Sequence, residues 1–275
     1  MRHIRLLRAR HILSALLCIA VCLFVVYILT SCSNGPSPAS GFSRNQTSRH
    51  YRANPNPTLM ELYDYKAGTG LIHREPNYGM IVWLDAGHGG IDSGTRAMVD
   101  GEVHLEKDIV LNIVLKAYEI FGSSDSGIKA FLTRTGDTHI PAAYRPYLWN
   151  GLADLVVSVH VDYFEGPSAY QVCGVQVNFY DNGYVNTGGA NITSAKFAQI
   201  MQDHLVYQTG ARDRNIRGDR SFAICAGSTI PVVLVEAGFM SNPEELALLI
   251  TAEYQWKIAM AIYYAVVEAS GFIVD

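Results

Sequence analysis

From about residue 79 onward, the spacing of apolar positions changes repeatedly between two patterns. Short runs rich in valine, isoleucine and leucine, bounded by glycine, proline or polar residues, are typical of buried strands. Runs with apolar residues three or four positions apart indicate amphipathic helices. The expected strands lie near Ile81–Asp85, Ile128–Thr133, Leu155–His160, Gly174–Tyr180, Phe222–Ala226 and Val232–Glu236. The expected helices lie near Glu106–Phe121, Ala142–Gly151, Ser194–Thr209, Pro243–Ile250 and Ala252–Ser270.

This alternation of strands and helices predicts an α/β domain with a mainly parallel sheet flanked by helices. One helix start is marked clearly, because Asn242 precedes Pro243 and two acidic residues. That order supplies a capping side chain, a proline at the first helical position and negative charge at the positive end of the helix dipole. Roughly 200 residues can bury one sizeable core, so a single domain is sufficient.

The first 31 residues follow a different pattern. Four arginines precede an apolar run from Ile12 to Leu29, and Leu29-Thr30-Ser31 leads into Cys32. A basic start, an apolar core and small residues before a break are the features of an export signal, and the placing of Cys32 resembles the lipobox of bacterial lipoproteins. We expect residues 1–31 to be a lipoprotein-type signal peptide, with lipid on Cys32 anchoring the chain to a membrane outside the cytoplasm. An uncleaved membrane helix is the alternative, because the run approaches the roughly 20 residues that span a bilayer.

Residues 32–77 are rich in serine, proline, asparagine, glycine and tyrosine, and they show no sustained apolar period. Such a segment buries too little apolar surface to offset the entropy lost on ordering its backbone. We therefore expect a flexible tether over 32–77 and a folded domain over 78–275.

The net charge of the chain bears on which class of partner it could bind. The net charge is −4, and without the signal the chain keeps 17 basic and 25 acidic side chains, a balance of −8. This balance argues against a sequence-independent nucleic-acid binder, which needs a basic face to neutralise phosphates.

Of the five cysteines, Cys173 and Cys225 lie in the expected domain. They could pair in an oxidising compartment, or each could be a free buried thiol.

Two polar residues directly follow apolar strands. The strand near Ile81–Asp85 leads into a loop in which glycines surround His88, leaving the imidazole uncrowded at the carboxyl end of the strand. Glu236 follows a run of β-branched residues, where an acid is costly unless it is paired, bound to metal or catalytic. The structural alternatives are a glycine-rich connection with an incidental histidine, and a salt bridge from Glu236 to Arg134 or Arg145.

Two further candidates stand at the ends of other elements. His160 ends the strand near Leu155–His160, and alternation along the strand puts Asp162 on the same face. Glu106 opens a helix, where a carboxylate can also act only as a partner for the helix dipole. Glu102 and His104 are the local competitors of Glu106 for a site role.

Together, His88, Glu106 and His160 supply two imidazoles and one carboxylate, a set that can bind zinc while leaving a coordination position open for water. Glu236 could then accept the proton of that water. The four residues therefore outline a metallohydrolase. The chain contains no G-x-S-x-G motif that would indicate a serine nucleophile.

The stretch from about 81 to 270 resembles the zinc-dependent N-acetylmuramoyl-L-alanine amidases of the amidase-3 family, which are bacterial cell-wall hydrolases. The matching segments occur in the same order and cover nearly all of the expected domain. They read LDAGHGG, LEKDIVLNI, FLTRTGD, YRPYLWNGLADLVVSVHVD and PVVLVEAGFMSN.

The resemblance implies a six-stranded sheet and one zinc ion bound by His88, Glu106 and His160, with Glu236 as the catalytic carboxylate. It also implies cleavage of the amide between the lactyl group of muramic acid and the first alanine of the stem peptide in peptidoglycan. One departure is Asp162, because the family often has asparagine there. Arg145 and Asn150 match an arginine and an asparagine of the family, and we expect them to be structural residues or to support the metal ligands from behind.

Two other functions stay open at this point. The chain could be a catalytically inactive lipoprotein that only binds peptidoglycan, or a zinc hydrolase that cleaves another amide bond of the stem peptide. Retention of all four polar positions argues against the inactive protein.

Overall fold

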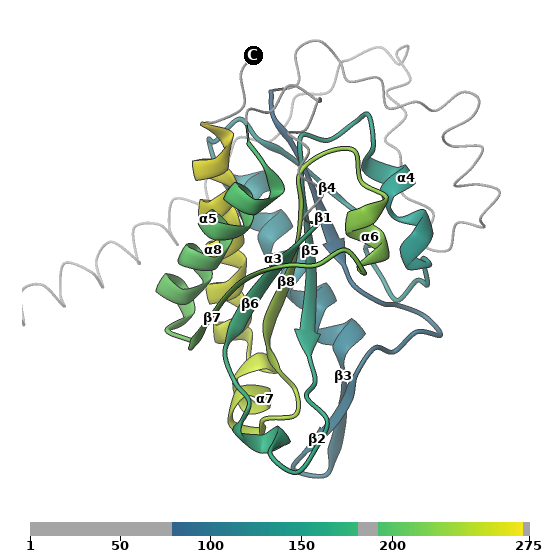
Figure 1. The fold of residues 1–275 in the computed structure, drawn as a ribbon, viewed down its shortest axis with the longest axis vertical. Helices are drawn as coiled ribbons and strands as arrows, with labels where there is room; N and C mark the ends of the chain where they lie inside the picture. Colours follow the sequence, from purple (N-terminus) through teal and green to yellow (C-terminus); the bar gives the residue numbers. More distant parts are fainter. Residues whose placement is uncertain (1–78, 181–191, 272–275) are drawn as a thin grey trace, which may run out of the picture. The chain divides into compact units, whose positions relative to one another are not determined.

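The computed structural model describes residues 79–180 and 192–271. The expected signal peptide and tether lie outside these described residues. Within them, six strands form one sheet in the order β4-β1-β5-β8-β6-β7 (Figure 1). The strands are β1 Ile81–Ala86, β4 Lys129–Leu132, β5 Leu155–Asp162, β6 Val175–Phe179, β7 Asp213–Gly218 and β8 Val232–Phe239.

Most neighbouring strands of this sheet are parallel. The pairs β1–β4, β1–β5, β5–β8 and β6–β7 run parallel, whereas β6 runs antiparallel to β8. The predicted mainly parallel α/β sheet is therefore confirmed. The carboxyl ends of β1, β5 and β8 meet at one end of the sheet, which is where open α/β sheets bind ligands (Figure 1).

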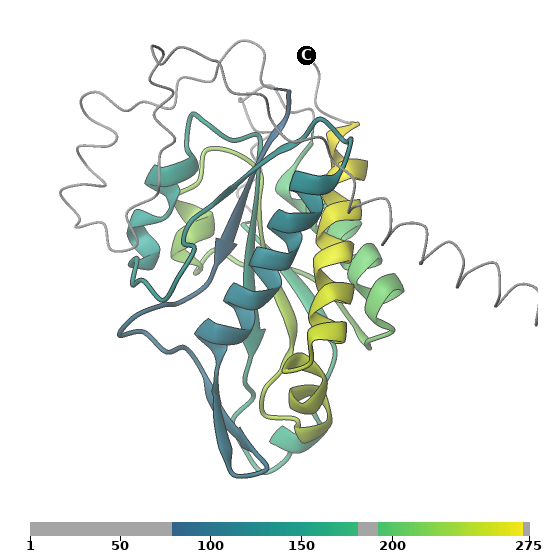
Figure 2. The same cartoon turned by 180° about the vertical axis from the view of Figure 1, so that it is seen from behind.

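Three long helices cover one face of the sheet, and two short helices lie on the other face (Figures 1 and 2). The long helices are α3 Glu106–Ser123, α5 Ser194–Thr209 and α8 Ala252–Ser270. The short helices are α4 Pro146–Trp149 and α6 Ala223–Ala226. Helix α7, Pro243–Leu249, begins after Asn242, whose side-chain oxygen accepts hydrogen bonds from the backbone amides of Glu244 and Glu245, as its sequence predicted.

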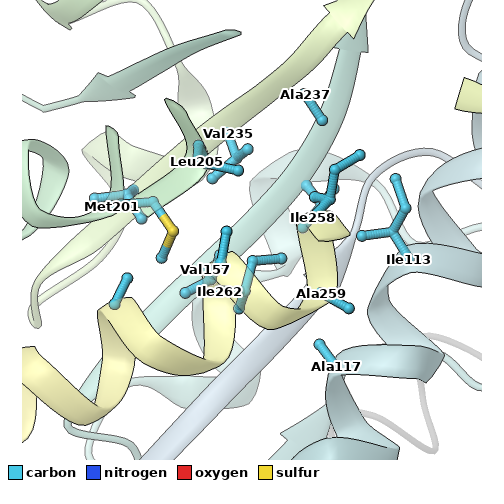
Figure 3. Close-up of a cluster of buried hydrophobic side chains, with 14 of the residues drawn as sticks. Ile113, Ala117, Val157, Met201, Leu205, Val235, Ala237, Ile258, Ala259 and Ile262 are labelled. Carbon is cyan, nitrogen blue, oxygen red and sulfur yellow. The ribbon is translucent and has the colours of Figure 1, made fainter. Parts of the chain in front are cut away.

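Helix α8 forms the centre of the larger core. It lies between α3 and α5, and small residues alternate with branched ones so that all three helices approach the sheet closely (Figure 3). The contacting side chains are Ile113 and Ala117 of α3, Met201 and Leu205 of α5, Ile258, Ala259 and Ile262 of α8, and Val157, Val235 and Ala237 of the sheet. Burying each large aliphatic side chain contributes about 1.5–3 kcal/mol, so this layer holds the strand ends rigidly.

The sequence prediction was wrong for Phe222–Ala226, which we expected to be a strand. Residues Ala223–Ala226 form the short helix α6 instead, and Ala226 N–H donates to the carbonyl of Phe222 at 2.9 Å. A five-residue apolar run has no distinguishing period, and here it packs as a helical turn under β8. The sixth strand of the sheet is instead β7, which was not predicted. It lies at the edge of the sheet, where its charged and exposed residues fit.

The expected helix Ala142–Gly151 is divided. A 3-10 turn, Ala142–Tyr144, precedes α4, and Pro146 stands at the junction, where it has no N–H to donate to a continuous helix. A hairpin that the sequence analysis did not predict, β2 Arg96–Val99 and β3 Glu102–Leu105, leads into α3. Among the helices of the described ranges, none combines the length and the apolarity that crossing a membrane would require.

Candidate metal centre

The loop after β1 brings His88 to the carboxyl end of the sheet. His88, Gly89 and Gly90 all have positive φ angles, of 57°, 128° and 58°, which turn the chain sharply. Gly87 makes room for a second imidazole, because a Cβ added there would lie 2.3 Å from the ring of His160. The glycines of this loop therefore allow two histidine rings to approach each other, with centroids 4.9 Å apart.

Glu106 is the first residue of α3 and is only 3% exposed. Its carboxylate is held from both sides, since Oε2 accepts from Thr95 N–H at 2.9 Å and Oε1 accepts from Val161 N–H at 3.2 Å. Gly94 is required for this approach, because a Cβ there would lie 2.6 Å from Oε2. Glu106 is thus a fixed and buried carboxylate rather than a solvated partner of the helix dipole.

The two histidines and Glu106 converge on one point. Glu106 Oε1 lies 3.0 Å from His88 Nε2 and 2.9 Å from His160 Nδ1. One ligand atom from each of the three residues lies within 4.8 Å of the other two, close enough to share an ion. The competitors Glu102 and His104 lie in β3 and do not belong to this group.

Charge at this point favours a cation. Burial alone raises the pKa of Glu106, but hydrogen bonds and charge from His160 and His88 hold it well below 4.5. Burial lowers the pKa of His88, yet its contacts with Glu106 and Asp92 outweigh this effect and place it above 6.5. The acids that favour a proton on His88 would equally favour a divalent cation in its place.

Glu236 lies beside this cluster. It stands in β8 directly opposite His160 in the parallel pairing with β5. Its Oε2 is buried and has no hydrogen-bond partner among the residues that the structure describes. Burial, followed by the negative charges of Asp162 and Glu106, raises the pKa of Glu236 well above 4.5. A buried carboxyl oxygen without a protein partner suits a group that handles a proton on a bound molecule.

The alternative salt bridge from Glu236 to Arg134 or Arg145 is not formed. Arg145 Nη1 instead pairs with buried Asp85 at 2.6 Å, and its Nη2 donates to the carbonyl of His88 at 2.7 Å. Arg134 Nη2 donates to the carbonyls of Gly87 at 2.8 Å and of Lys107 at 2.7 Å.

Arg134 therefore joins the loop that carries His88 to the helix that carries Glu106. Asn150, expected to be structural or to support the metal ligands, has structural contacts: its amide bridges the carbonyl of Gly227 and the N–H of Thr229. Cys173 and Cys225 are both free thiols, so the disulfide that the sequence left open is absent.

Asp92 was not among the residues predicted for the site, yet it contacts the ring of His88 at 2.9 Å. Asp92 lies in an exposed loop, and nothing in the apolar pattern marks it. A signal was present in its spacing, since an acid four residues after a candidate histidine can fold back onto the ring in a glycine-rich turn.

The cluster fits a zinc ion in its chemistry. Two imidazoles and one carboxylate are the donors of many catalytic zinc sites, which keep one position open for water or substrate. The glycine cradle around Glu106 and His160 excludes side chains from the point where the donors meet. The unpartnered oxygen of Glu236 stands on the neighbouring strand.

Comparisons with known proteins identify the family of the chain. The family model described as N-acetylmuramoyl-L-alanine amidase, amidase-3, matches residues 82–268. The chain is 31% identical over 225 residues to N-acetylmuramoyl-L-alanine amidase AmiA of Escherichia coli K12, covering 68% of this chain and 75% of AmiA.

Two solved structures are similar to the whole described domain. The N-acetylmuramoyl-L-alanine amidase of Clostridium difficile 630 matches with a TM-score of 0.62 and 29% identity, covering 70% of this chain and 96% of that one. The catalytic domain of CwlV from Bacillus (Paenibacillus) polymyxa matches with a TM-score of 0.61 and 29% identity, covering 70% of this chain and 99% of that one. The chain belongs to the amidase-3 family of N-acetylmuramoyl-L-alanine amidases, which hydrolyse peptidoglycan.

Proposed function

We propose that this amidase cleaves the bond between N-acetylmuramic acid and L-alanine with one zinc ion held by His88, Glu106 and His160, and with Glu236 as its catalytic carboxylate. The observation that carries the proposal is the convergence of three donor atoms within 4.8 Å of one another, beside Glu236 on the neighbouring strand. The amidase activity itself follows from membership of the family.

Zinc, when bound, would act as a Lewis acid that polarises the scissile carbonyl and makes a water molecule more acidic. The rest of the chemistry belongs to side chains of this chain. Glu236, in its ionised form, accepts a proton from the attacking water at the otherwise unpartnered Oε2. Glu236 then returns that proton to the alanine nitrogen as the carbon–nitrogen bond breaks.

Burial of Glu236 supports this double role. A group that both accepts and donates a proton works best when its pKa is near the working pH. The raised pKa of Glu236 is closer to neutral pH than that of an ordinary carboxyl group. The products are a glycan strand with a free lactyl carboxyl group and a stem peptide with a free alanine amino group. Hydrolysis adds one water across the amide, so the atoms balance.

We also propose that the domain acts at the cell envelope, outside the cytoplasm, in wall remodelling or cell separation. The basic and apolar start of the chain and the placing of Cys32 support a lipid anchor, with residues 32–77 as a tether between the anchor and the domain. Mass spectrometry of the protein from membranes tests the anchor, because acylated Cys32 would be the first residue of the mature chain.

The decisive experiment on the reaction is a digest of purified peptidoglycan by zinc-loaded protein, followed by mass spectrometry of the soluble products. Intact stem peptides with a free N-terminal alanine and unmodified glycan chains are expected. Shortened stem peptides would assign the enzyme to another amide bond. No release by a protein that has bound zinc would leave only a peptidoglycan-binding role.

A further inference from the structure

His88 lies between two carboxylates. Its Nε2 faces Glu106 Oε1 at 3.0 Å, on the side of the candidate metal centre. Its Nδ1 lies 2.9 Å from Asp92 Oδ1, on the opposite side of the ring. A neutral imidazole has one N–H donor and one acceptor nitrogen, and an ionised carboxylate only accepts. Donation from Nδ1 to Asp92 therefore leaves the lone pair of Nε2 free and directed at the metal centre.

The backbone holds Asp92 in this position. Its N–H and carbonyl exchange hydrogen bonds with Gly89 at 3.1 and 2.8 Å, which closes the loop around His88. Oδ1 also accepts from Gly94 N–H at 3.1 Å. The side chain of Asp92 is 46% exposed, so it is not part of the hydrophobic core. Hydrogen bonds within the loop fix the orientation of the Asp92 side chain. The fold does not depend on burial of this side chain.

Asp137 offers a natural comparison. Its Oδ1 accepts from Gly90 N–H at 2.6 Å, and its Oδ2 binds Lys107 Nζ at 2.7 Å. Asp137 thus braces the same loop, and its side chain is 52% exposed, close to the value for Asp92. Asp137 accepts hydrogen bonds from Gly90 and Lys107 rather than from an imidazole. Asp137 supports only the loop, whereas Asp92 supports the loop and also contacts the ring of His88. Comparing variants of the two acids therefore distinguishes the two effects.

We propose that Asp92 is a positioning residue for the metal: it holds His88 in the Nδ1–H tautomer and in the orientation that presents Nε2 to the ion. This inference rests on the zinc centre of the proposed function. A carboxylate behind a ligating histidine also makes the ligand nitrogen more basic, and loss of such a partner weakens metal binding by about 10–100-fold in known sites.

The test compares full-length wild-type protein with three variants, Asp92→Ala, Asp92→Asn and Asp137→Ala. Zinc affinity is measured by competition with a chelating dye, without substrate. Asp92→Ala is expected to bind zinc about 10–100-fold more weakly. Asp92→Asn is expected to lose less, because its amide oxygen still accepts from Nδ1 but carries no charge. Asp137→Ala is expected to bind zinc as tightly as the wild type.

A second readout does not depend on zinc. Nitrogen-15 NMR of the metal-free proteins reports which imidazole nitrogen of His88 carries hydrogen. At a pH high enough for the imidazole of His88 to be neutral, the wild type and Asp137→Ala should show the Nδ1–H tautomer, whereas Asp92→Ala should show a mixture. Thermal unfolding of the metal-free variants checks that each is folded before its affinity is compared.

Wild-type zinc affinity in Asp92→Ala would overturn the proposal, and so would an equal loss in Asp137→Ala, which would assign the effect to the loop. Failure of the proposed function looks different. In that case the wild type binds zinc and Asp92→Ala binds it more weakly, yet the peptidoglycan digest releases no stem peptide with a free alanine.

Discussion

Glu236 stands directly opposite His160 in the parallel pairing of β5 and β8. Side chains of paired residues in neighbouring strands point to the same face of a sheet, so this register alone brings the carboxyl group proposed as the base to the candidate metal centre. The two residues are 76 positions apart in the chain, and the buried valines that precede each of them fix the register.

Replacing Glu236 by glutamine should separate metal binding from turnover. The amide keeps the size of the side chain but cannot accept a proton from water, so we expect turnover of peptidoglycan to fall by roughly 10²–10⁴-fold. Zinc content, measured by atomic absorption, should stay at the wild-type level. Normal digestion by Glu236→Gln would show that another group is the base.

The charge of Asp162 should shift the acid limb of the pH–rate profile, which the ionisation of Glu236 determines. Burial raises the pKa of Glu236 most, and the negative charge of Asp162 raises it further. Because the base must be ionised, activity falls as pH drops through this raised pKa. Asp162→Asn removes the charge, so the fall should move to lower pH.

Turnover measured from pH 4 to 8 tests this shift. Asparagine has nearly the same size and shape as aspartate, so we expect the variant to fold and to stay active. Glu165→Gln is the control, because it removes an exposed acid nearby and should leave the profile unchanged. An unchanged profile in Asp162→Asn would contradict the role of its charge.

The sequence was sufficient to predict the buried strands and the long helices. Unbroken valine and isoleucine runs are typical of parallel strands covered on both faces, and β1, β5 and β8 have that pattern. The four candidate site residues could be found for the same reason, since each stands where an apolar element begins or ends. The structure brings all four to one end of the sheet.

Features that depend on tertiary contacts could not be predicted. Strand β7 is recognisable only by its pairing with β6, because half of its six residues are charged and only one is a large apolar residue. Asp92 reaches His88 only through the positive φ angles of the loop, and Arg134 acts through backbone carbonyls that any sequence would supply. Neither type of contact leaves a hydrophobic period in the sequence, and the i, i+4 spacing of His88 and Asp92 indicates a contact only once the turn of the loop is known.

Gly87→Ala should damage the site without unfolding the domain. The added methyl group would lie 2.3 Å from the His160 ring, so the imidazole must move away from Glu106. A displacement of about 1 Å in a catalytic group can lower activity by about 100-fold, and we expect a loss of this order together with weaker zinc binding.

Gly122→Ala is the matched control for that variant. A Cβ at Gly122 has no neighbour within 4 Å, and the position lies in α3. Alanine is favoured over glycine in helices, so stability should stay the same or rise by up to about 1 kcal/mol. Circular dichroism and zinc affinity of both variants distinguish a local collision from a general effect of replacing glycine.

Asp85→Asn should cost stability in a way that depends on pH. Asp85 is fully buried and pairs with Arg145 at 2.6 Å, and Ser158 Oγ donates to its other oxygen at 2.6 Å. Removing one partner of a buried ion pair leaves the other charge uncompensated and typically costs about 3–5 kcal/mol. Urea unfolding at pH 7, with zinc removed by a chelator, measures this loss.

The sign of the pH effect follows from the pKa of Asp85. Burial raises it, but Arg145 and Ser158 outweigh burial and hold the pKa below 3.8. The ion pair therefore contributes fully above the pKa of the unfolded chain, and its contribution disappears as pH falls through the lower pKa of the folded state. The difference in unfolding free energy between wild type and Asp85→Asn should be constant from pH 5 to 7 and should shrink below about pH 4. A difference in unfolding free energy that does not change with pH would mean that the charge of Asp85 does not stabilise the folded state.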